Sequence, residues 1–253
     1  MTLRSTISTP DGKRRYVRRL FATIADRYDF ITVFLSYGRD RRWKRRLIGL
    51  AAVKADDRML DLACGTGDLL LAASANARMA VGLDVTHRML QLAERHRVRN
   101  VRPDSAGSAS SGCQHVRFVT GDMLALPFGD SCFDVVTTGY GLRNVPDLAS
   151  AIHEIHRVLV PGGRFLSLDF NRPANRLVRG AYLAYLTLVG SALGFALHRD
   201  PNTYRYIPES IRQYPGATGV ARLFEVAGFT DVRVVALLGG LMAIHVARKA
   251  LSG

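Results

Sequence analysis

The sequence predicts an α/β fold with a mostly parallel sheet, helices on both faces and an antiparallel strand that closes the sheet. From Arg58 onward, short apolar runs alternate with stretches of helical periodicity, which is typical of parallel strands joined by crossover helices. The first run leads into a Gly-x-Gly turn, Gly65-Thr66-Gly67, and the second ends in an acid, Asp84. A chain of 253 residues can bury one such core with additions.

The apolar runs predict five consecutive strands, at residues 58–63, 79–84, 116–120, 133–138 and 164–170. Helical periodicity predicts the elements between them, at residues 67–76, 86–96 and 147–159. A helix at Leu223–Ala227, capped by Gly228, precedes Val232–Ala236 and Leu241–Ala247, which we expect to form the antiparallel pair. Pro103–Gln114 is small, polar and rich in Gly and Ser, and we expect a flexible loop there.

Two regions depart from the α/β pattern, although we expect residues 1–253 to form a single domain. Residues 1–54 form a predicted helical cap. Its first helix spans residues 14–28, with Val17, Leu20, Phe21, Ile24 and Tyr28 on one face, and its second spans Arg41–Leu50. Residues 172–212 form a predicted helical insertion over the substrate site, because they hold Gly180–Leu197, a segment without a charged residue.

The charge of the chain is strongly positive and concentrated in the cap. The net charge is +14, and residues 1–54 hold fourteen Lys and Arg against four acids. This balance favours an anionic partner, either a nucleic acid or an anionic membrane, although a solvated arginine-rich surface would look the same. Cys64, Cys113 and Cys132 show no metal-binding spacing, so we expect no metal site and a reduced, cytoplasmic compartment. The first residues lack the apolar stretch of a secretory signal.

The Gly-x-Gly turn predicts a nucleoside-binding crevice, in which Asp84 accepts hydrogen bonds from a ribose. A lone Gly-x-Gly is more often a simple turn, so the surrounding residues decide its meaning. Leu70 replaces the third glycine of a dinucleotide site, and Asp61 ahead of the turn would repel a pyrophosphate. A carboxylate there suits a cationic amino group. S-adenosylmethionine has that group, a ribose and no phosphate, so Asp61, Gly65, Thr66 and Gly67 are its predicted binding residues.

Two further segments follow strands and point to the same crevice. Asp122-Met123 follows the third strand, where the carboxylate would accept from the adenine amino group, although Asp122 could also cap a turn. Gly139-Tyr140-Gly141-Leu142-Arg143-Asn144 follows the fourth strand, at the edge where open α/β sheets bind ligands. Enzymes that methylate amino groups of nucleic acids usually carry an acid or Asn, two prolines and an aromatic here. This chain does not, which disfavours base methylation.

Several segments together resemble the UbiE-type ubiquinone/menaquinone biosynthesis C-methyltransferases. They are Ala25-Asp26-Arg27-Tyr28-Asp29, Trp43-Lys44-Arg45, Asp61–Asp68, Gly141-Leu142-Arg143-Asn144-Val145, Arg157–Gly163, Tyr204–Ile211 and Gly239–His245. The resemblance implies a class I, Rossmann-like methyltransferase fold. It also implies that Thr66, Asp84, Asp122 and Met123 contact S-adenosylmethionine. Gly139 stands where ubiquinone-type members often have a serine.

The resemblance implies C-methylation of a prenylated quinol ring. Gly139-Tyr140 and Leu168-Asp169-Phe170-Asn171 look closer to naphthoquinone members, so we expect demethylmenaquinol as substrate, with a ubiquinone-pathway quinol as the alternative. Alternatives of another class are an RNA methyltransferase and a non-catalytic, membrane-associated protein that binds S-adenosylmethionine. No RNA-binding motif is apparent, so we expect no nucleic-acid partner.

The resemblance also supplies catalytic and substrate-binding candidates. Arg143 is expected to stabilise the developing quinolate, because a guanidinium does not act as a base near neutral pH. Asn144 would either bind a quinol oxygen or hold the loop. The candidates for substrate contact are Tyr28, Tyr140, Tyr204, Tyr206 and His245. Such aromatic residues and a lone histidine are more often parts of a core.

A prenylated substrate implies work at a membrane, so we expect a peripheral enzyme at the inner face of the cell membrane. Gly180–Leu197 reaches only the lower limit of transmembrane length, and we expect a buried or interfacial helix. Its apolar side chains would face the prenyl chain or the lipid: Tyr182, Leu183, Leu186, Leu188, Leu193, Phe195 and Leu197. Trp43, among Arg41, Arg42, Lys44, Arg45 and Arg46, would face anionic lipid.

Overall fold

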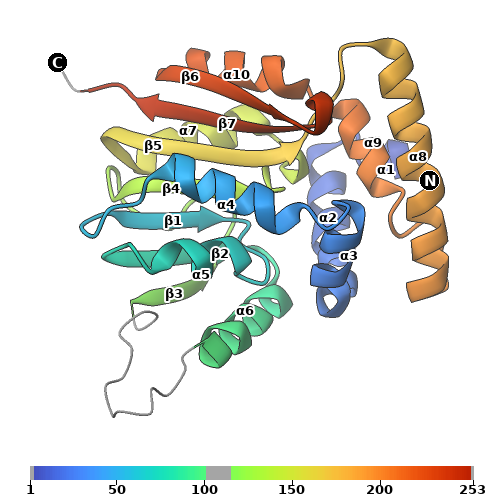
Figure 1. Ribbon diagram of the computed structural model, residues 1–253, viewed down its shortest axis with the longest axis horizontal. Helices are drawn as coiled ribbons and strands as arrows, with labels where there is room; N and C mark the ends of the chain where they lie inside the picture. Colours follow the sequence, from blue (N-terminus) through green and yellow to red (C-terminus); the bar gives the residue numbers. More distant parts are fainter. Residues whose placement is uncertain (1–2, 101–114, 252–253) are drawn as a thin grey trace.

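The computed structural model describes residues 3–100 and 115–251; the predicted loop at Pro103–Gln114 and Cys113 lie outside these residues. Within them, the chain forms a seven-stranded mixed sheet in the order β3-β2-β1-β4-β5-β7-β6 (Figure 1). Strands β1 to β5 run parallel, and β7 pairs antiparallel with both β5 and β6. The predicted fold class is confirmed.

The strands lie where the apolar runs placed them. They are β1 (Arg58–Leu62), β2 (Met79–Asp84), β3 (Val116–Thr120), β4 (Phe133–Gly139), β5 (Leu159–Phe170), β6 (Phe229–Leu237) and β7 (Met242–Lys249). Strand β5 begins at Leu159, earlier than the predicted residue 164, because Pro161-Gly162-Gly163 is part of the strand. Leu159 pairs with Phe133, and the register then slips so that Arg164 pairs with Val135. Gly162, with φ of +76°, accommodates this irregularity.

Helices cover both faces of the sheet. They are α4 (Asp40–Ala51), α5 (Asp68–Ser74), α6 (His87–Asn100), α7 (Leu148–Val158) and α10 (Gly216–Val226). Helices α4 and α5 pack on the face that carries Met59, Val135 and Leu166, whereas α7 and α10 pack on the opposite face. The predicted helix at Leu223–Ala227 is therefore only the last part of α10. Gly228 ends it at φ of +90°, as expected of a C-terminal cap.

The remaining helices gather beyond the carboxyl ends of the parallel strands (Figure 1). They are α1 (Leu3–Thr6), α2 (Pro10–Ile24), α3 (Tyr28–Leu35), α8 (Arg176–His198) and α9 (Tyr206–Gln213). The prediction of one helix over residues 14–28 is wrong at its end. A 3₁₀ turn at Ala25–Arg27 separates α2 from α3, and no glycine or proline marks this break in the sequence. Side chains of α2 and α8 share one apolar cluster, so the cap and the insertion pack together.

Two predictions about lipid-facing residues are wrong. Trp43 is 6% exposed and packs against Leu69 and Leu166, because it lies on the face of α4 that covers the sheet. In α8, four of the side chains expected to face the prenyl chain or the lipid are buried against the body of the protein and do not line the second cavity: Tyr182, Leu183, Leu186 and Leu193. Leu188 and Phe195 are exposed, as expected. Among the described helices, α8 is the one long and apolar enough to cross a bilayer, and a third of its most apolar window is buried.

Candidate active site

Two adjoining cavities lie at the carboxyl end of the sheet, beneath α2 and α3. The first has a volume of about 750 Å³ and is lined by the loops after β1, β2, β3 and β4. The second, of about 640 Å³, lies among α2, α3, α9 and the end of β5 and is lined mainly by apolar and aromatic side chains. Phe21, Tyr28 and Tyr140 line both cavities. Two ligands bound in these cavities would therefore meet at these three side chains.

The Gly-x-Gly turn forms one wall of the first cavity. Gly65 and Gly67 have φ of +55° and +85°, so both use backbone conformations that favour glycine. Asp84 holds the turn: its Oδ2 accepts from the Gly65 amide at 3.0 Å, and its Oδ1 accepts from the Thr86 amide at 2.7 Å. Asp84 also lines the cavity, and burial raises the pKa of its carboxyl. Its carboxylate thus lies at the crevice, and its contact with a ribose stays a prediction.

Asp61 lies behind the turn and is fully buried. Its Oδ1 accepts from the Thr137 hydroxyl at 2.7 Å, whereas Oδ2 has no hydrogen-bond partner among the described residues. Burial raises the pKa of Asp61 from 3.8 to about 7. A buried carboxylate oxygen without a donor is costly, so a cationic group bound on the other side of the turn would stabilise the charged form of Asp61.

The loops after β3 and β4 complete the first cavity. Asp122 accepts from the Leu124 amide at 2.9 Å and forms an ion pair with Arg14 of α2 at 2.5 Å. Met123 and Gly139 line the same cavity. A Cβ on Gly141 would lie 2.3 Å from Thr138 Oγ1, so only glycine lets this loop follow its path.

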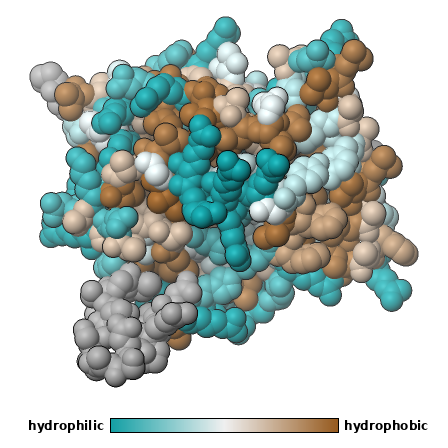
Figure 2. Space-filling view, viewed as in Figure 1, coloured by the Kyte–Doolittle hydropathy of each residue, from teal (hydrophilic) through white to brown (hydrophobic). Residues whose placement is uncertain are grey.

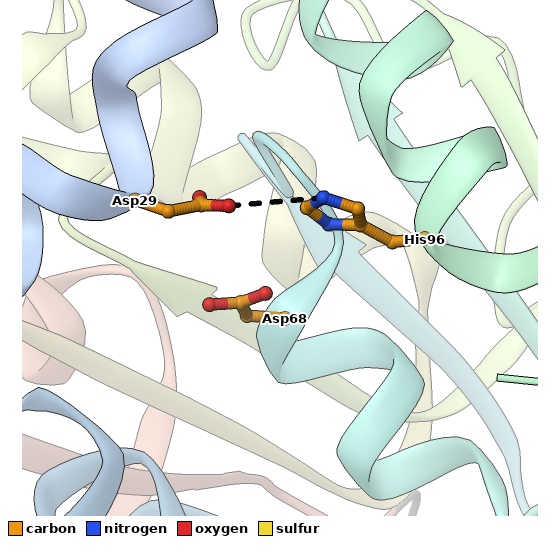
Figure 3. Close-up of side chains that lie close together, drawn as sticks. All are labelled: Asp29, Asp68 and His96. Atoms are coloured by element: carbon orange, nitrogen blue, oxygen red, sulfur yellow. Dashed lines mark ion pairs between the residues drawn. The ribbon is translucent and has the colours of Figure 1, made fainter. Parts of the chain in front are cut away.

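A polar cluster fastens the cap to the Gly-x-Gly turn (Figure 3). The Thr66 hydroxyl donates to Asp29 Oδ1 at 2.6 Å, and His96 Nδ1 lies 3.1 Å from the Thr66 carbonyl oxygen. His96 Nε2 lies 3.8 Å from Asp29 Oδ2. Ligand-type atoms of Asp29, Asp68 and His96 lie within 4.8 Å of one another, but all three residues already interact with protein groups, since Lys44 is 3.5 Å from Asp68. We assign the cluster a positioning role rather than a metal.

Arg143 lines the second cavity and forms a buried ion pair with Asp169. Its Nε donates to Asp169 Oδ1 at 3.1 Å, and its backbone amide donates to Asp169 Oδ2 at 3.1 Å. Nη1 donates to Asn144 Oδ1 and to Ser210 Oγ, and the guanidinium carbon lies 4.9 Å from the centre of the Phe170 ring. No acceptor for Nη2 is found in the described part of the chain. The guanidinium is therefore fixed on one side and has one nitrogen left for a ligand.

The tyrosines of the second cavity differ in how their hydroxyls are used. Tyr140 donates to Asp40 at 2.7 Å, and Asp40 forms a buried ion pair with Lys44. Tyr204 is hydrogen-bonded to His198 at 2.8 Å. The Tyr206 hydroxyl is buried and has no partner within the described residues, so it is free to bond to a ligand oxygen.

The structure brings most of the predicted residues to the two cavities. Gly65, Asp84, Asp122, Met123, Gly139 and Asn144 line the first; Arg143, Tyr204 and Tyr206 line the second; Tyr28 and Tyr140 line both. Asp61, Thr66 and Gly67 line neither cavity and support the wall of the first from behind.

The contacts of His245 differ from its expected role, whereas those of Asn144 match one of its two expected roles. His245 lines neither cavity, because it is enclosed between Ser167 and the Ala217 carbonyl, so we do not retain it as a substrate contact. Asn144 bonds to the Tyr140 carbonyl and to Arg143, so both ends of its amide hold the loop.

Sequence reasoning missed the residues that hold Arg143 and Tyr140 in place. Asp169, Ser210 and Asp40 belong to distant segments, and nothing local marks Ser210 or Asp40 as a partner. Asp169 had one usable signal, since it lies at the end of a parallel strand as Asp84 does. Lys13 was also missed. Its Nζ donates to the Arg143 carbonyl at 3.0 Å, and burial, followed by the charge of Arg143, lowers the pKa of Lys13 to about 8.

Comparison with known proteins identifies the family. The ubiE/COQ5 methyltransferase family matches residues 9–249, nearly the whole chain. The chain belongs to this family. It is 40% identical over 229 residues to the demethylmenaquinone methyltransferase of Thermus thermophilus, covering 90% of this chain and 98% of that protein. It is 35% identical over 238 residues to the ubiquinone/menaquinone biosynthesis C-methyltransferase UbiE of Rubrivivax gelatinosus, covering 94% of this chain and 88% of that protein.

The solved structures agree with membership of a methyltransferase family at the level of the fold. A SAM-dependent methyltransferase of Thermotoga maritima, described as a possible histamine N-methyltransferase, superposes with a TM-score of 0.63 at 16% identity. The match covers 92% of this chain and 99% of that chain. The chain is thus a methyltransferase of the ubiE/COQ5 family with a class I fold.

Proposed function

We propose that this enzyme transfers the methyl group of S-adenosylmethionine to a ring carbon of a prenylated naphthoquinol, converting demethylmenaquinol to menaquinol. The observation that carries the proposal is the pair of adjoining cavities: one is bordered by Gly65 of the Gly-x-Gly turn, Asp84 and Asp122, and the other is mostly apolar with a single fixed guanidinium. The name of the Thermus thermophilus relative supports the substrate. The Rubrivivax gelatinosus relative, whose name includes ubiquinone, keeps a ubiquinone-pathway quinol as the second candidate.

The residues of the first cavity fit S-adenosylmethionine. Asp84 would hold the ribose hydroxyls. Asp61 lines neither cavity, so its negative charge would favour the amino group from behind the turn without a direct contact. Asp122 and Met123 would meet the adenine, with Arg14 of α2 closing over that end. When bound, the cofactor supplies an electrophilic methyl group on a sulfonium.

The second cavity fits a quinol ring and the first part of its prenyl chain. Most of its lining is apolar, which suits the ring face and the chain. The free Nη2 of Arg143 and the unpartnered Tyr206 hydroxyl are donors suited to the quinol oxygens. Tyr28 and Tyr140, which line both cavities, would then bound the place where the two ligands react.

Arg143 has the properties needed for electrostatic catalysis. A quinol becomes nucleophilic at its ring carbon when one hydroxyl releases its proton to solvent, so charge develops on the oxygen. Methylation of the carbon is then completed by loss of the ring-carbon proton and reprotonation of the oxygen, so one proton is released overall. The guanidinium is a cation, and its position is fixed before the reaction by Asp169 and Ser210. Binding both ligands with the ring carbon next to the methyl group would raise the rate further, because the reacting atoms would already be aligned.

The chemistry of the substrate also sets the expected location. A prenylated quinol remains in a bilayer, so we propose that the enzyme is cytoplasmic and works at the inner face of the membrane as a peripheral protein. The described cysteines, Cys64 and Cys132, are both free thiols, in keeping with a reducing compartment. The net charge of +14 would suit RNA as well as an anionic membrane, but neither of the two relatives described above carries a name that refers to nucleic acid.

The proposal is tested by incubating the purified enzyme with S-adenosylmethionine and chemically reduced demethylmenaquinol in detergent. We expect a product heavier by one methylene unit, together with S-adenosylhomocysteine. Reduced demethoxylated or demethylated benzoquinols form the second arm and measure the ubiquinone alternative. S-adenosylhomocysteine formed with neither quinol class, or formed only with RNA, would refute the proposal.

A further inference from the structure

Helix α3 carries apolar side chains on both of its faces, although one face is exposed. On the inner face, Ile31 and Leu35 are buried and line the second cavity. On the outer face, the large apolar residues are between 41% and 57% exposed: Phe30, Val33, Phe34 and Tyr37. A helix that is apolar all round is normally buried on all sides. The outer face of α3 is therefore exposed to solvent, although its apolar composition is typical of a buried surface.

Helix α8 runs beside α3 in the opposite direction. Tyr37, just after α3, stacks on Tyr185 with ring centres 5.9 Å apart, and Arg27, just before α3, bonds to the Leu197 carbonyl. The two contacts are ten residues apart around α3 and twelve residues apart on α8, and they occur in opposite order along the two segments. Both helices lie beyond the carboxyl ends of the strands, with α8 at the outer edge of the molecule (Figure 1).

The exposed side of α8 extends the apolar surface. Leu177, Leu188 and Phe195 are 85%, 72% and 63% exposed. Between them, Ala181, Ala184 and Ala192 are also exposed, so the stripe follows the helical repeat along about 27 Å of helix. Figure 2 shows hydrophobic side chains gathered over the side of the molecule where α3 and α8 lie. We call these outer faces of α3 and α8 the α3–α8 surface.

The charges around the α3–α8 surface are mostly positive. Exposed arginines stand at the ends of the two helices: Arg27 and Arg39 beside α3, and Arg172, Arg176 and Arg199 beside α8. Helix α8 contains no acid. The acids nearest in sequence are Asp26, which pairs with Arg88, and Asp29 and Asp200. An apolar stripe with arginines at its ends matches the interface of an anionic bilayer, where apolar side chains enter the acyl boundary and cations meet the headgroups.

We propose that the α3–α8 surface docks on an anionic lipid bilayer and holds the second cavity against it. Because Ile31 and Leu35 line that cavity from the other side of α3, the cavity lies one helix thickness from the docked face. The buried face of α8, which includes Tyr182 and Leu186, stays on the body of the protein, so α8 lies along the bilayer and does not cross it. The inference rests on the proposed function only for the lipid-soluble nature of the substrate.

Vesicle binding without any substrate tests the docking. Full-length enzyme is sedimented with vesicles of phosphatidylcholine alone or mixed with phosphatidylglycerol. We expect binding that requires phosphatidylglycerol and weakens with salt. Phe30→Ser/Phe34→Ser/Leu188→Ser/Phe195→Ser is expected to lower the affinity at least about tenfold. Arg176→Gln/Arg199→Gln is expected to lower it by about 30-fold, at the usual strength of two cations at such a surface. The matched control is Val98→Ser/Val226→Ser, which changes two valines that are 59% and 81% exposed elsewhere.

A second measurement covers the case in which the fourfold variant does not fold. In Phe195→Trp, the fluorescence emission of the new indole is expected to shift to shorter wavelength on phosphatidylglycerol vesicles. Spin-labelled lipid is expected to quench this emission, whereas the emission of the buried Trp43 should stay constant and serves as the reference. An unchanged emission, or equal binding by the fourfold variant and wild type, would overturn the docking. So would a dimer that Phe30→Ser/Phe34→Ser dissociates, without vesicle binding, since a second copy would then cover the surface.

The docking and the proposed function fail separately. An enzyme that binds vesicles but methylates no quinol contradicts the function and leaves the docking intact. An enzyme that methylates a short-chain quinol and a vesicle-embedded quinol equally well, without binding vesicles, contradicts the docking alone. When both hold, the fourfold variant keeps its turnover on the short-chain quinol and loses it on the embedded one, because none of its four positions lines either of the two cavities.

Discussion

Replacing Arg143 by lysine separates its chemical role from its structural one. The side chain of Asp169 beside it is only 2% exposed, so Arg143→Ala would leave a buried carboxylate without its cation. Loss of one member of a buried pair costs about 3–5 kcal/mol of stability, and an alanine variant would mainly measure unfolding. Lysine keeps a cation in the pair.

The expected effect of Arg143→Lys follows from the contacts of the guanidinium. Arg143 uses Nε for Asp169 and Nη1 for Asn144 and Ser210, and keeps Nη2 for the quinol. A single ammonium held by Asp169 does not also reach the substrate. Losing one charge-assisted hydrogen bond in the transition state costs about 1.5–3 kcal/mol, which lowers turnover by about 10- to 150-fold.

The assay measures kcat and KM for a short-chain naphthoquinol at saturating S-adenosylmethionine, with the urea midpoint as the measure of stability. We expect a low kcat, a cofactor affinity close to that of wild type and a urea midpoint close to that of wild type. Arg212→Lys is the control, because that arginine is 44% exposed and pairs with Glu209 on its own helix. A folded Arg143→Lys variant that keeps wild-type turnover would refute the assigned role of Nη2.

Three further predictions concern the cofactor wall. Asp84→Asn is expected to weaken S-adenosylmethionine binding by about 10- to 150-fold in calorimetry, because a charged acceptor is lost; unchanged affinity in a folded variant would remove Asp84 from the site. Because burial raises the pKa of Asp61 to about 7, the folded chain holds this proton more tightly than the unfolded chain, so this group makes the free energy of unfolding fall between about pH 4 and pH 7. Because the charged carboxylate of Asp61 attracts the amino group of the cofactor, cofactor affinity should rise over the same pH range. Asp61→Asn should remove both the slope in urea titrations and this rise in affinity; an unchanged pH profile would contradict the prediction. Thr66→Val breaks the bond to Asp29 and is expected to weaken cofactor binding about fivefold, with no change in kcat at saturation; equal affinity would show that the cap does not position the turn.

The sequence was sufficient to predict the features that depend on local pattern. Strand β2 ends at Asp84 as predicted, because the apolar run before Asp84 is buried inside the parallel sheet and the acid lies at the end of the strand. The Gly-x-Gly turn follows from the conformations that Gly65 and Gly67 must adopt. The position of Arg143 after β4 follows from the rule that parallel strands present their carboxyl ends at one edge.

Features that depend on contacts between distant segments were not predictable in this way. Asp169 lies 26 residues beyond Arg143, and only the pairing of β4 with β5 brings the two together. Trp43 stands in a basic run, yet the arginines and the indole lie on different faces of α4, and the indole covers the sheet. No residue pattern signals the break between α2 and α3. This break makes α3 a separate helix, whose outer face is exposed.

The most direct test of the central claim is the fate of a labelled methyl group. Enzyme, S-adenosylmethionine with a ¹³C-methyl group and demethylmenaquinone are combined with and without a chemical reductant, and the product is examined by NMR. The account predicts label on the ring carbon of the naphthoquinol, and only in the reduced sample, because the oxidised ring is not a nucleophile. Label on a quinol oxygen, or equal transfer to the oxidised quinone, would contradict it.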